Sequence, residues 1–137
     1  MVRRYAFRLP RHPASVGLAR RRVRDHLTDW GLGAGSPALA DAVLLVSELA
    51  TNVVRHGPLT EAEFEIAVTA LADGSCLIEV SDEGARMPRL RTVDDDQEAG
   101  RGLHLVEHVA TAWGVWSRGT HGKTVWALVH SEPQAPA

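Results

Sequence analysis

The segment from Ser36 to His56 constrains the fold most, because its pattern predicts one long helix with two polar groups on an apolar surface. Ser36-Pro37 resembles a helix start, with serine as N-cap and proline in the first turn, and Gly57-Pro58 ends the pattern. Glu48 and Asn52 are four residues apart, so they project from the same side of this helix. Their neighbours are mostly apolar, and an acid and an amide without partners are costly to bury there. Such a pair favours a site that waits for a ligand.

The chemistry of the two side chains suggests which ligand. An asparagine oxygen is a hard ligand suited to Mg²⁺, and a glutamate beside it can orient or deprotonate a hydroxyl group or a water molecule. Glu48 and Asn52 together therefore suggest a metal–phosphate site. The spacing alone is equally compatible with a structural pair, in which Glu48 binds an arginine and Asn52 caps a loop. The rest of the chain has to decide between the two interpretations.

Length and composition predict one domain over residues 1–137. The chain has 45% apolar residues, enough for a single core without disulfides or structural metal. The one cysteine, Cys76, lies in an apolar run and is expected to be a buried core thiol. No apolar run approaches the roughly 20 residues that cross a bilayer, and no signal-peptide pattern opens the chain. We therefore expect a cytoplasmic protein that does not enter a membrane.

Charge is distributed unevenly along the chain. Residues 1–24 carry eight arginines and no acid, which leaves seven bases against seventeen acids, a net charge of −10, for the remainder. Four of the arginines fall on a short predicted helix with apolar residues on its other side, which favours a solvated or protein-docking face. A direct nucleic-acid contact is not expected, because the domain as a whole is mildly acidic.

Periodicity and turn signals predict a two-layer α/β (α+β) sandwich, in which three helices cover one face of a mixed, largely antiparallel sheet. Asp73-Gly74 is a hairpin signal, and residues 83–101 lose periodicity and read as a lid-like loop. The expected helices are Ala14 to Trp30, Ser36 to His56 and Gly102 to Trp113. The expected strands are Tyr5 to Leu9, Phe64 to Val68, Leu77 to Val80, Val115 to Arg118 and Thr124 to His130.

Two further motifs carry chemistry. Asp82 ends an apolar strand and Gly84 follows it, so the carboxylate could accept a hydrogen bond from an exocyclic amine, or could simply cap its own turn. Gly100 and Gly102 open a predicted helix, whose free N–H groups and positive dipole end suit phosphate. Two glycines before a helix are also common in ordinary loops, so neither motif decides the function alone.

The order of these motifs is more specific than any one of them. The chain runs from ExxxN on a helix through strand-Asp-x-Gly, a long loop and Gly-x-Gly-Leu to a final Gly-Lys-Thr strand. This order resembles the Bergerat-type ATP-binding fold of DNA gyrase B, sensor histidine kinases and MutL. The segments ELATNVVRHG, GRGLHLVEHVA and GKTVWALV look most like the stand-alone anti-sigma-factor serine kinases of bacteria. The resemblance runs from about Ala38 to Val129.

The resemblance implies ATP and Mg²⁺ as cofactors and a role for each matching residue. Asn52 would be the Mg²⁺ ligand, Glu48 the base that takes the proton of a serine hydroxyl, and Asp82 the partner of the adenine amino group. Thr124 would support the adenine end. In the loop region, Gly84 would shape the base pocket, Gly100 and Gly102 would let backbone approach the phosphates, and Arg101 could neutralise their charge.

The resemblance also implies partners: a STAS-type anti-anti-sigma protein that is phosphorylated, a sigma factor that is sequestered, and a second copy of the chain in a homodimer. One departure from the family pattern leaves a second hypothesis open. Arg86 stands where the Asp-x-Gly-x-Gly box has its second glycine, and its side chain could narrow the adenine pocket. The alternative is a non-catalytic binding protein with weak or absent nucleotide binding.

Two short motifs are expected to be chance matches. His104, Glu107 and His108 fit the HxxEH pattern of a zinc protease, but no carboxylate stands well placed downstream as the third protein ligand. Gly122-Lys123-Thr124 resembles the end of a P-loop, but a strand rather than a helix is predicted to follow it. We therefore expect neither a zinc site nor a P-loop.

Overall fold

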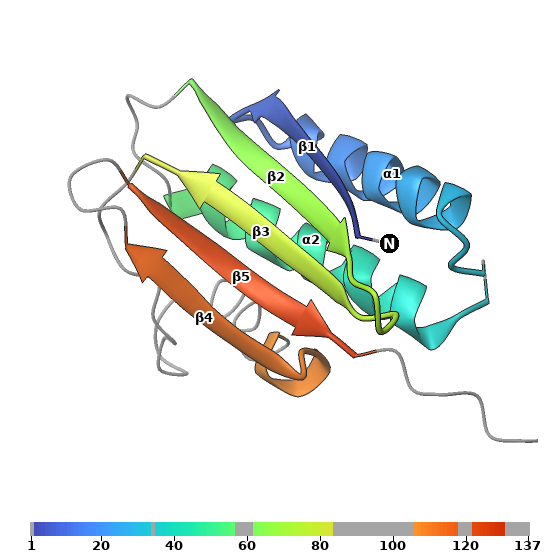
Figure 1. Ribbon diagram of the computed structural model, residues 1–137. Coiled ribbons are helices and arrows are strands. Elements are labelled where there is room, and N and C mark those ends of the chain that lie inside the picture. Colours follow the sequence, from blue (N-terminus) through green and yellow to red (C-terminus); the bar gives the residue numbers. More distant parts are fainter. Residues whose placement is uncertain (1, 34, 57–61, 84–105, 118–121, 131–137) are drawn as a thin grey trace, which may run out of the picture.

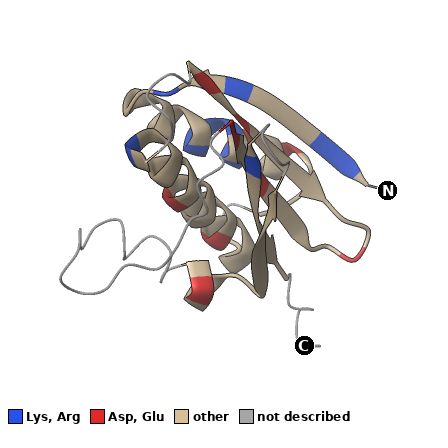
Figure 2. Ribbon diagram, turned by 90° about the vertical axis from the view of Figure 1, so that its left-hand side faces the viewer, with Lys and Arg blue, Asp and Glu red and all other residues tan. Residues whose placement is uncertain are grey.

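The computed structural model describes residues 2–33, 35–56, 62–83, 106–117 and 122–130. Five strands form one sheet in the order β1-β2-β3-β5-β4, and two long helices lie on one side of it (Figures 1 and 2). The helices are α1, Ala14–Asp29, and α2, Pro37–His56. The strands are β1, Arg3–Pro10; β2, Glu63–Ala70; β3, Cys76–Asp82; β4, Ala112–Ser117; and β5, Lys123–Val129.

α2 forms where the sequence predicts it, and it packs its apolar stripe against the sheet. Leu45, Leu49 and Val53 recur at helical spacing on the buried side, and all three belong to the core. By length and composition α2 could cross a membrane, with a mean hydropathy of 1.4, but half of it is buried inside the protein. Its apolar character is therefore explained by its packing on the sheet and against α1 beside it.

α1 packs beside α2, and its buried apolar residues lie on a different side of the helix from its exposed arginines. Ala19, Val23 and Leu27 are fully buried, whereas Arg20 and Arg24 are exposed. His26 stacks on Tyr5 of β1, with ring centroids 3.6 Å apart, which ties the end of the helix to the first strand. The expected amphipathic division of this helix is therefore confirmed.

The β2–β3 hairpin has the predicted turn. Gly74 takes a positive φ of 89°, and the Asp73 carboxylate accepts a hydrogen bond from the Ser75 backbone N–H at 2.8 Å. This register places Ile66, Val68, Ile78 and Val80 in the core beneath α2. Cys76 is also buried there, as expected, and burial raises the pKa of its thiol to about 12.

One detail differs from the sequence prediction. The expected helix through Trp113 is wrong at its end, because described helix covers 106–109 and β4 already begins at Ala112. The Thr111 backbone N–H donates to the Leu128 carbonyl, so pairing with β5 takes over from the helical pattern there. All ladders among the described strands are antiparallel, in keeping with the predicted mixed, largely antiparallel sheet, and no parallel pair occurs among them. The α+β sandwich itself is confirmed.

Candidate functional site

The predicted site residues within the described part of the chain come from α2 and from the adjoining ends of β3 and β5. Glu48 and Asn52 lie on α2, Asp82 is the last residue of β3, and Thr124 is the second residue of β5. The remaining predicted site residues lie outside the described residues; they are Gly84, Gly100, Arg101 and Gly102. Arg86 lies outside them as well. The described part of the site therefore consists of an α2 side, on that helix, and a sheet side, at the ends of β3 and β5.

Glu48 is half-buried on α2, and burial raises the pKa of its carboxyl group above the ordinary value of 4.5. The Arg55 guanidinium, two helical turns further along, opposes this shift through its positive charge. A carboxylate whose pKa is raised toward neutral pH is a better general base than an ordinary surface glutamate. The direction of this shift is compatible with the predicted role of Glu48 as a base, which stays a prediction.

Asn52 is half-buried one turn after Glu48. Within the described residues, no hydrogen bond is formed by the Asn52 side chain, nor by the Glu48 carboxylate. The structural alternative, in which Asn52 caps a loop, has no support there. A half-buried amide and acid side by side on one helix leave two oxygen-bearing groups available to a ligand.

Asp82 differs from Glu48 because its carboxylate accepts hydrogen bonds from a lysine side chain. Lys123 Nζ lies 3.0 Å from one oxygen of the Asp82 carboxylate and 3.2 Å from the other. The two side chains are 10% and 4% exposed, respectively, so the pair is almost completely removed from solvent. In the register of β3 and β5 these residues lie directly opposite each other. They are on the same sheet face as Val80 and Val125, the face that packs against the helices. The end of the sheet therefore carries a buried ion pair.

Gly122 makes this close approach possible. Its φ is 110°, and a Cβ atom at this position would lie 2.1 Å from the Asp82 carbonyl oxygen and 2.6 Å from the Glu83 Cα atom. Only glycine fits a backbone this close at such a φ. The start of β5 is therefore held against the end of β3, and Lys123 is aligned with Asp82.

Thr124 contacts a serine on the neighbouring strand. Its hydroxyl group lies 2.7 Å from the Ser81 hydroxyl group, and the register places Thr124 between Ser81 of β3 and Trp116 of β4 on the other face of the sheet. The assignment of Thr124 to the adenine end stays a prediction. The register gives the position opposite Asp82 to Lys123.

Sequence reasoning missed Lys123 as a site residue. The Gly122-Lys123-Thr124 segment carried part of the family resemblance and also resembles the end of a P-loop, but no role was assigned to Lys123, and β5 follows as the predicted strand. The available signal was its position directly after a glycine, at the start of a predicted strand. The register across 41 residues could not be obtained from the sequence alone.

The donors of this site fit magnesium nucleotide better than a metal ion held by protein alone. Among the described residues, no group of three or more His, Cys, Asp or Glu side chains is placed to hold a metal ion. Mg²⁺ usually keeps waters and takes one or two protein oxygens together with substrate phosphates. Asn52 offers one such oxygen, so the α2 side fits a metal that arrives with a triphosphate. His104 of the zinc motif lies outside the described residues.

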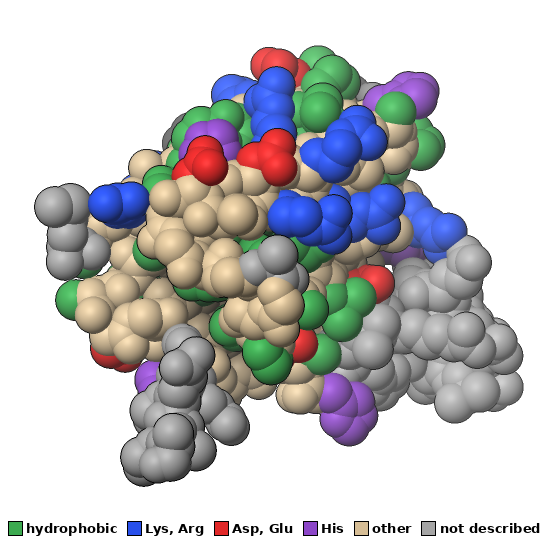
Figure 3. Space-filling model, turned by 90° about the vertical axis from the view of Figure 1, so that its right-hand side faces the viewer, with side chains coloured by type: hydrophobic (Ala, Val, Ile, Leu, Met, Phe, Trp, Pro, Cys, Tyr) green, Lys and Arg blue, Asp and Glu red, His purple; other side chains and the backbone are tan. Residues whose placement is uncertain are grey.

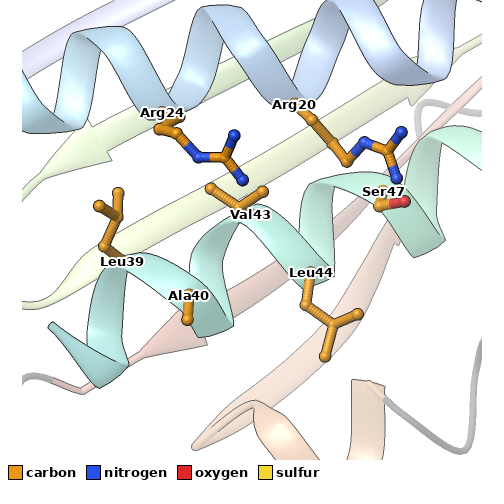
Figure 4. Close-up of a pocket in the computed structure, with 7 residues that line it drawn as sticks. All are labelled: Arg20, Arg24, Leu39, Ala40, Val43, Leu44 and Ser47. Atoms are coloured by element: carbon orange, nitrogen blue, oxygen red, sulfur yellow. The ribbon is translucent and has the colours of Figure 1, made fainter. Parts of the chain in front are cut away.

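A groove runs between α1 and α2 beside this site. It has a volume of about 350 Å³; from α1, Arg24 reaches toward Val43 and Arg20 reaches toward Ser47 of α2 (Figure 4). Basic side chains gather over this side of the molecule in the space-filling view (Figure 3). The lining residues are Arg20, Arg24, Leu39, Ala40, Val43, Leu44 and Ser47.

Comparisons with known structures support the fold. A Mycobacterium tuberculosis structure of RsbU and RsbW domains matches with a TM-score of 0.72 and 22% identity, over 96% of this chain and 33% of that one. The SiaB–SiaC complex from Pseudomonas aeruginosa matches with a TM-score of 0.67 and 14% identity, over 91% and 88%. The histidine kinase domain of a blue-light activated kinase from Erythrobacter litoralis matches with a TM-score of 0.52 and 17% identity, over 90% and 62%.

These identities are low, and the chain spans one third of the first structure, so the likeness concerns the fold. No curated protein gives a significant match. The family model of the histidine kinase-like ATPase domain matches residues 9–129, which include both helices, β2 to β5 and every predicted site residue. The expected superfamily is thereby confirmed, and the chain belongs to the histidine kinase-like ATPase domain family.

Proposed function

We propose that this protein is an ATP-dependent serine kinase that phosphorylates an anti-anti-sigma protein of the STAS type and sequesters a sigma factor. The observation that carries the proposal is the pair on α2, where Glu48 has a raised pKa and Asn52 lies one turn away within an ATPase domain. The similar M. tuberculosis structure contains an RsbW domain beside an RsbU domain, and the P. aeruginosa structure is a complex of SiaB with SiaC. These neighbours support a regulator that works through protein partners.

In the proposed reaction, Glu48 receives the proton of the attacking serine hydroxyl group. The serine oxygen forms a bond to the γ-phosphorus of ATP, and the bond from that phosphorus to the bridging oxygen of ADP breaks. Asn52 would hold Mg²⁺, which neutralises phosphate charge when it is bound, and Asp82 would bind the adenine amino group. Positioning and charge neutralisation provide most of the catalysis in phosphoryl transfer.

The groove between α1 and α2 supports the protein-binding part of the proposal. Its apolar floor includes Leu39 and Val43, and Arg20 and Arg24 provide positive charge, so it suits an acidic segment with apolar side chains. We place a protein partner there. Cytoplasmic location and a homodimer complete the proposal; the homodimer rests on the family resemblance.

A second candidate function is a protein-binding module that holds ATP weakly or not at all. The observation that favours it is the Asp82–Lys123 pair, because the carboxylate expected to bind adenine already accepts hydrogen bonds from a lysine. If Lys123 blocks the base, the fold and the groove would remain useful without catalysis.

Calorimetric titration with ATP and Mg²⁺, followed by a phosphoryl-transfer assay with the STAS-type partner, distinguishes these functions. We expect Glu48→Gln to bind ATP normally but to transfer phosphate roughly 10² to 10⁴ times more slowly, as is typical when a general base is lost. Asn52→Ala should lose Mg²⁺-dependent ATP binding, whereas Asp41→Asn, on the same helix and outside the groove lining, should behave as the wild type. A wild-type protein that binds ATP weakly or not at all and transfers no phosphate would support the binding module and contradict the kinase.

A further inference from the structure

The groove between α1 and α2 combines positive charge with apolar surface. Its lining contains two cations, Arg20 and Arg24, and no acid. Both arginines are exposed, and within the described residues neither takes part in an ion pair. Guanidinium groups are well suited to hold carboxylates at an interface, so this groove fits a ligand that carries acidic groups.

Both walls of the groove repeat with the period of a helix. Arg20 and Arg24 are four residues apart on α1, and Ala40 and Leu44 are four residues apart on α2, so each pair repeats at about 6 Å along its helix. Ala40 is exposed and Leu44 is half-buried, so a ligand can reach both apolar side chains. A matching ligand therefore carries acidic groups at this spacing beside an apolar surface.

We propose that this groove receives one acidic amphipathic helix of a partner protein. Acidic side chains one turn apart on that helix pair with Arg20 and Arg24, and its apolar stripe packs on Ala40 and Leu44. The inference rests on the protein-binding part of the proposed function and names the kind of segment that the partner presents. It requires no phosphoryl transfer.

The walls of the groove favour a helix over an extended segment. Both walls are helices, whose backbone groups are bonded within each helix except at its ends. The edge strands of the sheet, β1 and β4, contribute no residue to the lining. An extended peptide would therefore bury backbone N–H and C=O groups without partners, which is costly, whereas a helix satisfies its own.

The acids beside the groove favour a single helix over a nucleic acid or an anionic membrane. Asp25 directly follows Arg24 on α1, and Asp41 directly follows Ala40 on α2, so each wall also carries a negative charge. A helix can direct its carboxylates at the two arginines and away from these acids. A polyanion repeats its charges along its whole length and cannot avoid them.

The test measures the binding of a designed helical peptide to the wild-type protein by calorimetry and by NMR titration. The peptide has roughly 15 residues, about four helical turns, with a leucine stripe and two glutamates one turn apart beside it. We expect a dissociation constant of roughly 10 to 100 μM, because the small interface must offset the cost of association. The amide signals of Ala40, Leu44 and Ser47 should be among those that move. No binding of this peptide would overturn the inference.

Three control peptides each change one property. Lysines replace the glutamates in the first, serines replace the leucines in the second, and a central proline prevents the helix in the third. Each should bind at least roughly tenfold more weakly than the glutamate peptide. A proline peptide of equal affinity would show an extended ligand, and a serine peptide of equal affinity would show a site for charge alone; either result contradicts the proposal.

A pair of variants assigns the binding to the groove. Arg24→Glu should weaken binding of the glutamate peptide roughly tenfold and strengthen binding of the lysine peptide, because it reverses one charge of the groove. Arg21→Glu is the matched control, since Arg21 is exposed on the same helix and lies outside the lining. It should change both affinities by less than about twofold. Equal losses in the two variants would show general attraction to a basic helix and would overturn the inference.

The outcomes separate this inference from the kinase. Peptide binding by a wild-type protein that transfers no phosphate would retain the helix-binding groove and remove the kinase. Phosphoryl transfer without peptide binding would retain the kinase and overturn the helix-binding groove. Duplex DNA or anionic vesicles that displace the glutamate peptide and bind more weakly to Arg24→Glu would also overturn it, because the groove would then serve a polyanion.

Discussion

The two sides of the candidate site each present a carboxylate, but the two carboxylates differ in burial and in the charged residue near them. On α2, Glu48 is half-buried, its pKa is raised, and the charge that acts on it comes from Arg55 two turns away. At the end of β3, Asp82 is buried and lies 3.0 Å from Lys123. The contrast is therefore between a helix carboxylate that forms no hydrogen bond among the described residues and a strand carboxylate held in a buried ion pair.

The difference follows from the elements that carry the two residues. A helix surface can present a side chain beside a cleft without a partner opposite it, because its backbone hydrogen bonds are satisfied within the helix. A residue within a paired strand always has a cross-strand neighbour, and the register decides which one. Asp82 faces Lys123 because Gly122 sets that register. Strand pairing therefore fixes the neighbour of the Asp82 side chain on the sheet side, whereas no cross-strand neighbour fixes the Glu48 side chain on the α2 side. The sheet side is accordingly the fixed side of the site, and the α2 side is the adjustable side.

The largest loss of stability is expected from a substitution at Gly122, on the fixed side of the site. Gly122→Ala should lower the free energy of unfolding by more than about 4 kcal/mol, because it combines an unfavourable positive φ with a Cβ atom 2.1 Å from the Asp82 carbonyl oxygen. Gly31→Ala is the matched control, with a φ of 106° and no atom within 4 Å of the added Cβ. It should cost only about 1 to 2 kcal/mol. Urea unfolding of both variants measures the difference, and equal losses would show that β5 is not held against β3.

The next effect concerns the buried ion pair. Lys123→Met should lower the free energy of unfolding by about 3 kcal/mol or more, because it removes the positive charge that faces the buried Asp82 carboxylate. The double variant Asp82→Asn/Lys123→Met should recover part of this loss, since it removes the remaining charge.

The exposed pairs of Arg8 provide the control for this prediction. Arg8 lies 3.7 Å from Glu63 and 4.0 Å from Glu65; the Arg8 and Glu63 side chains are about half exposed, and Glu65 is partly exposed. Arg8→Met should therefore change the free energy of unfolding by less than about 1 kcal/mol. If Lys123→Met and Arg8→Met cost the same in urea unfolding, the sheet side is not the buried, fixed region described above.

The adjustable side is tested by pH. Since burial raises the pKa of Glu48, the proposed transfer rate should rise with pH through a midpoint above 4.5 and should fall about tenfold per pH unit well below that midpoint. Arg55→Gln removes the positive charge that opposes the shift, so the midpoint should move to higher pH, whereas Arg8→Gln should leave it in place. A midpoint that moves to lower pH in Arg55→Gln would contradict the electrostatic assignment.

The same shift has a consequence for stability, with a definite sign. The pKa of Glu48 is higher in the folded state than in the unfolded chain, so the folded state holds the proton more tightly. Its contribution to stability is therefore present below about pH 4.5 and is lost as the pH rises through the folded-state pKa. Glu48→Gln should remove this contribution to the pH dependence of unfolding.

The parts of the molecule that could be predicted from the sequence are those that depend on local patterns. Helix α2, the Asp73-Gly74 turn and the pair of Glu48 and Asn52 follow from spacing along one segment, and the structure describes the helix and the turn as predicted. The end of the third helix was wrong because Ala112 and Trp113 pair with β5, a contact that lies outside the segment itself. The lysine opposite Asp82 was missed for the same reason.

The smallest effect concerns the face of the sheet that points away from the helices. Ser81 and Thr124 share a hydrogen bond of 2.7 Å there, although the family resemblance assigned Thr124 to the adenine end. In a double-mutant cycle of Ser81→Ala and Thr124→Val, the two side chains should be coupled by about 1 kcal/mol in urea unfolding. Thr124→Val should change ADP affinity by less than about twofold, because the hydroxyl group lies on the opposite face from Lys123 and Asp82. A tenfold loss of ADP affinity would mean that the threonine contributes to the base pocket, and the division of labour between the two faces of β5 would then be wrong.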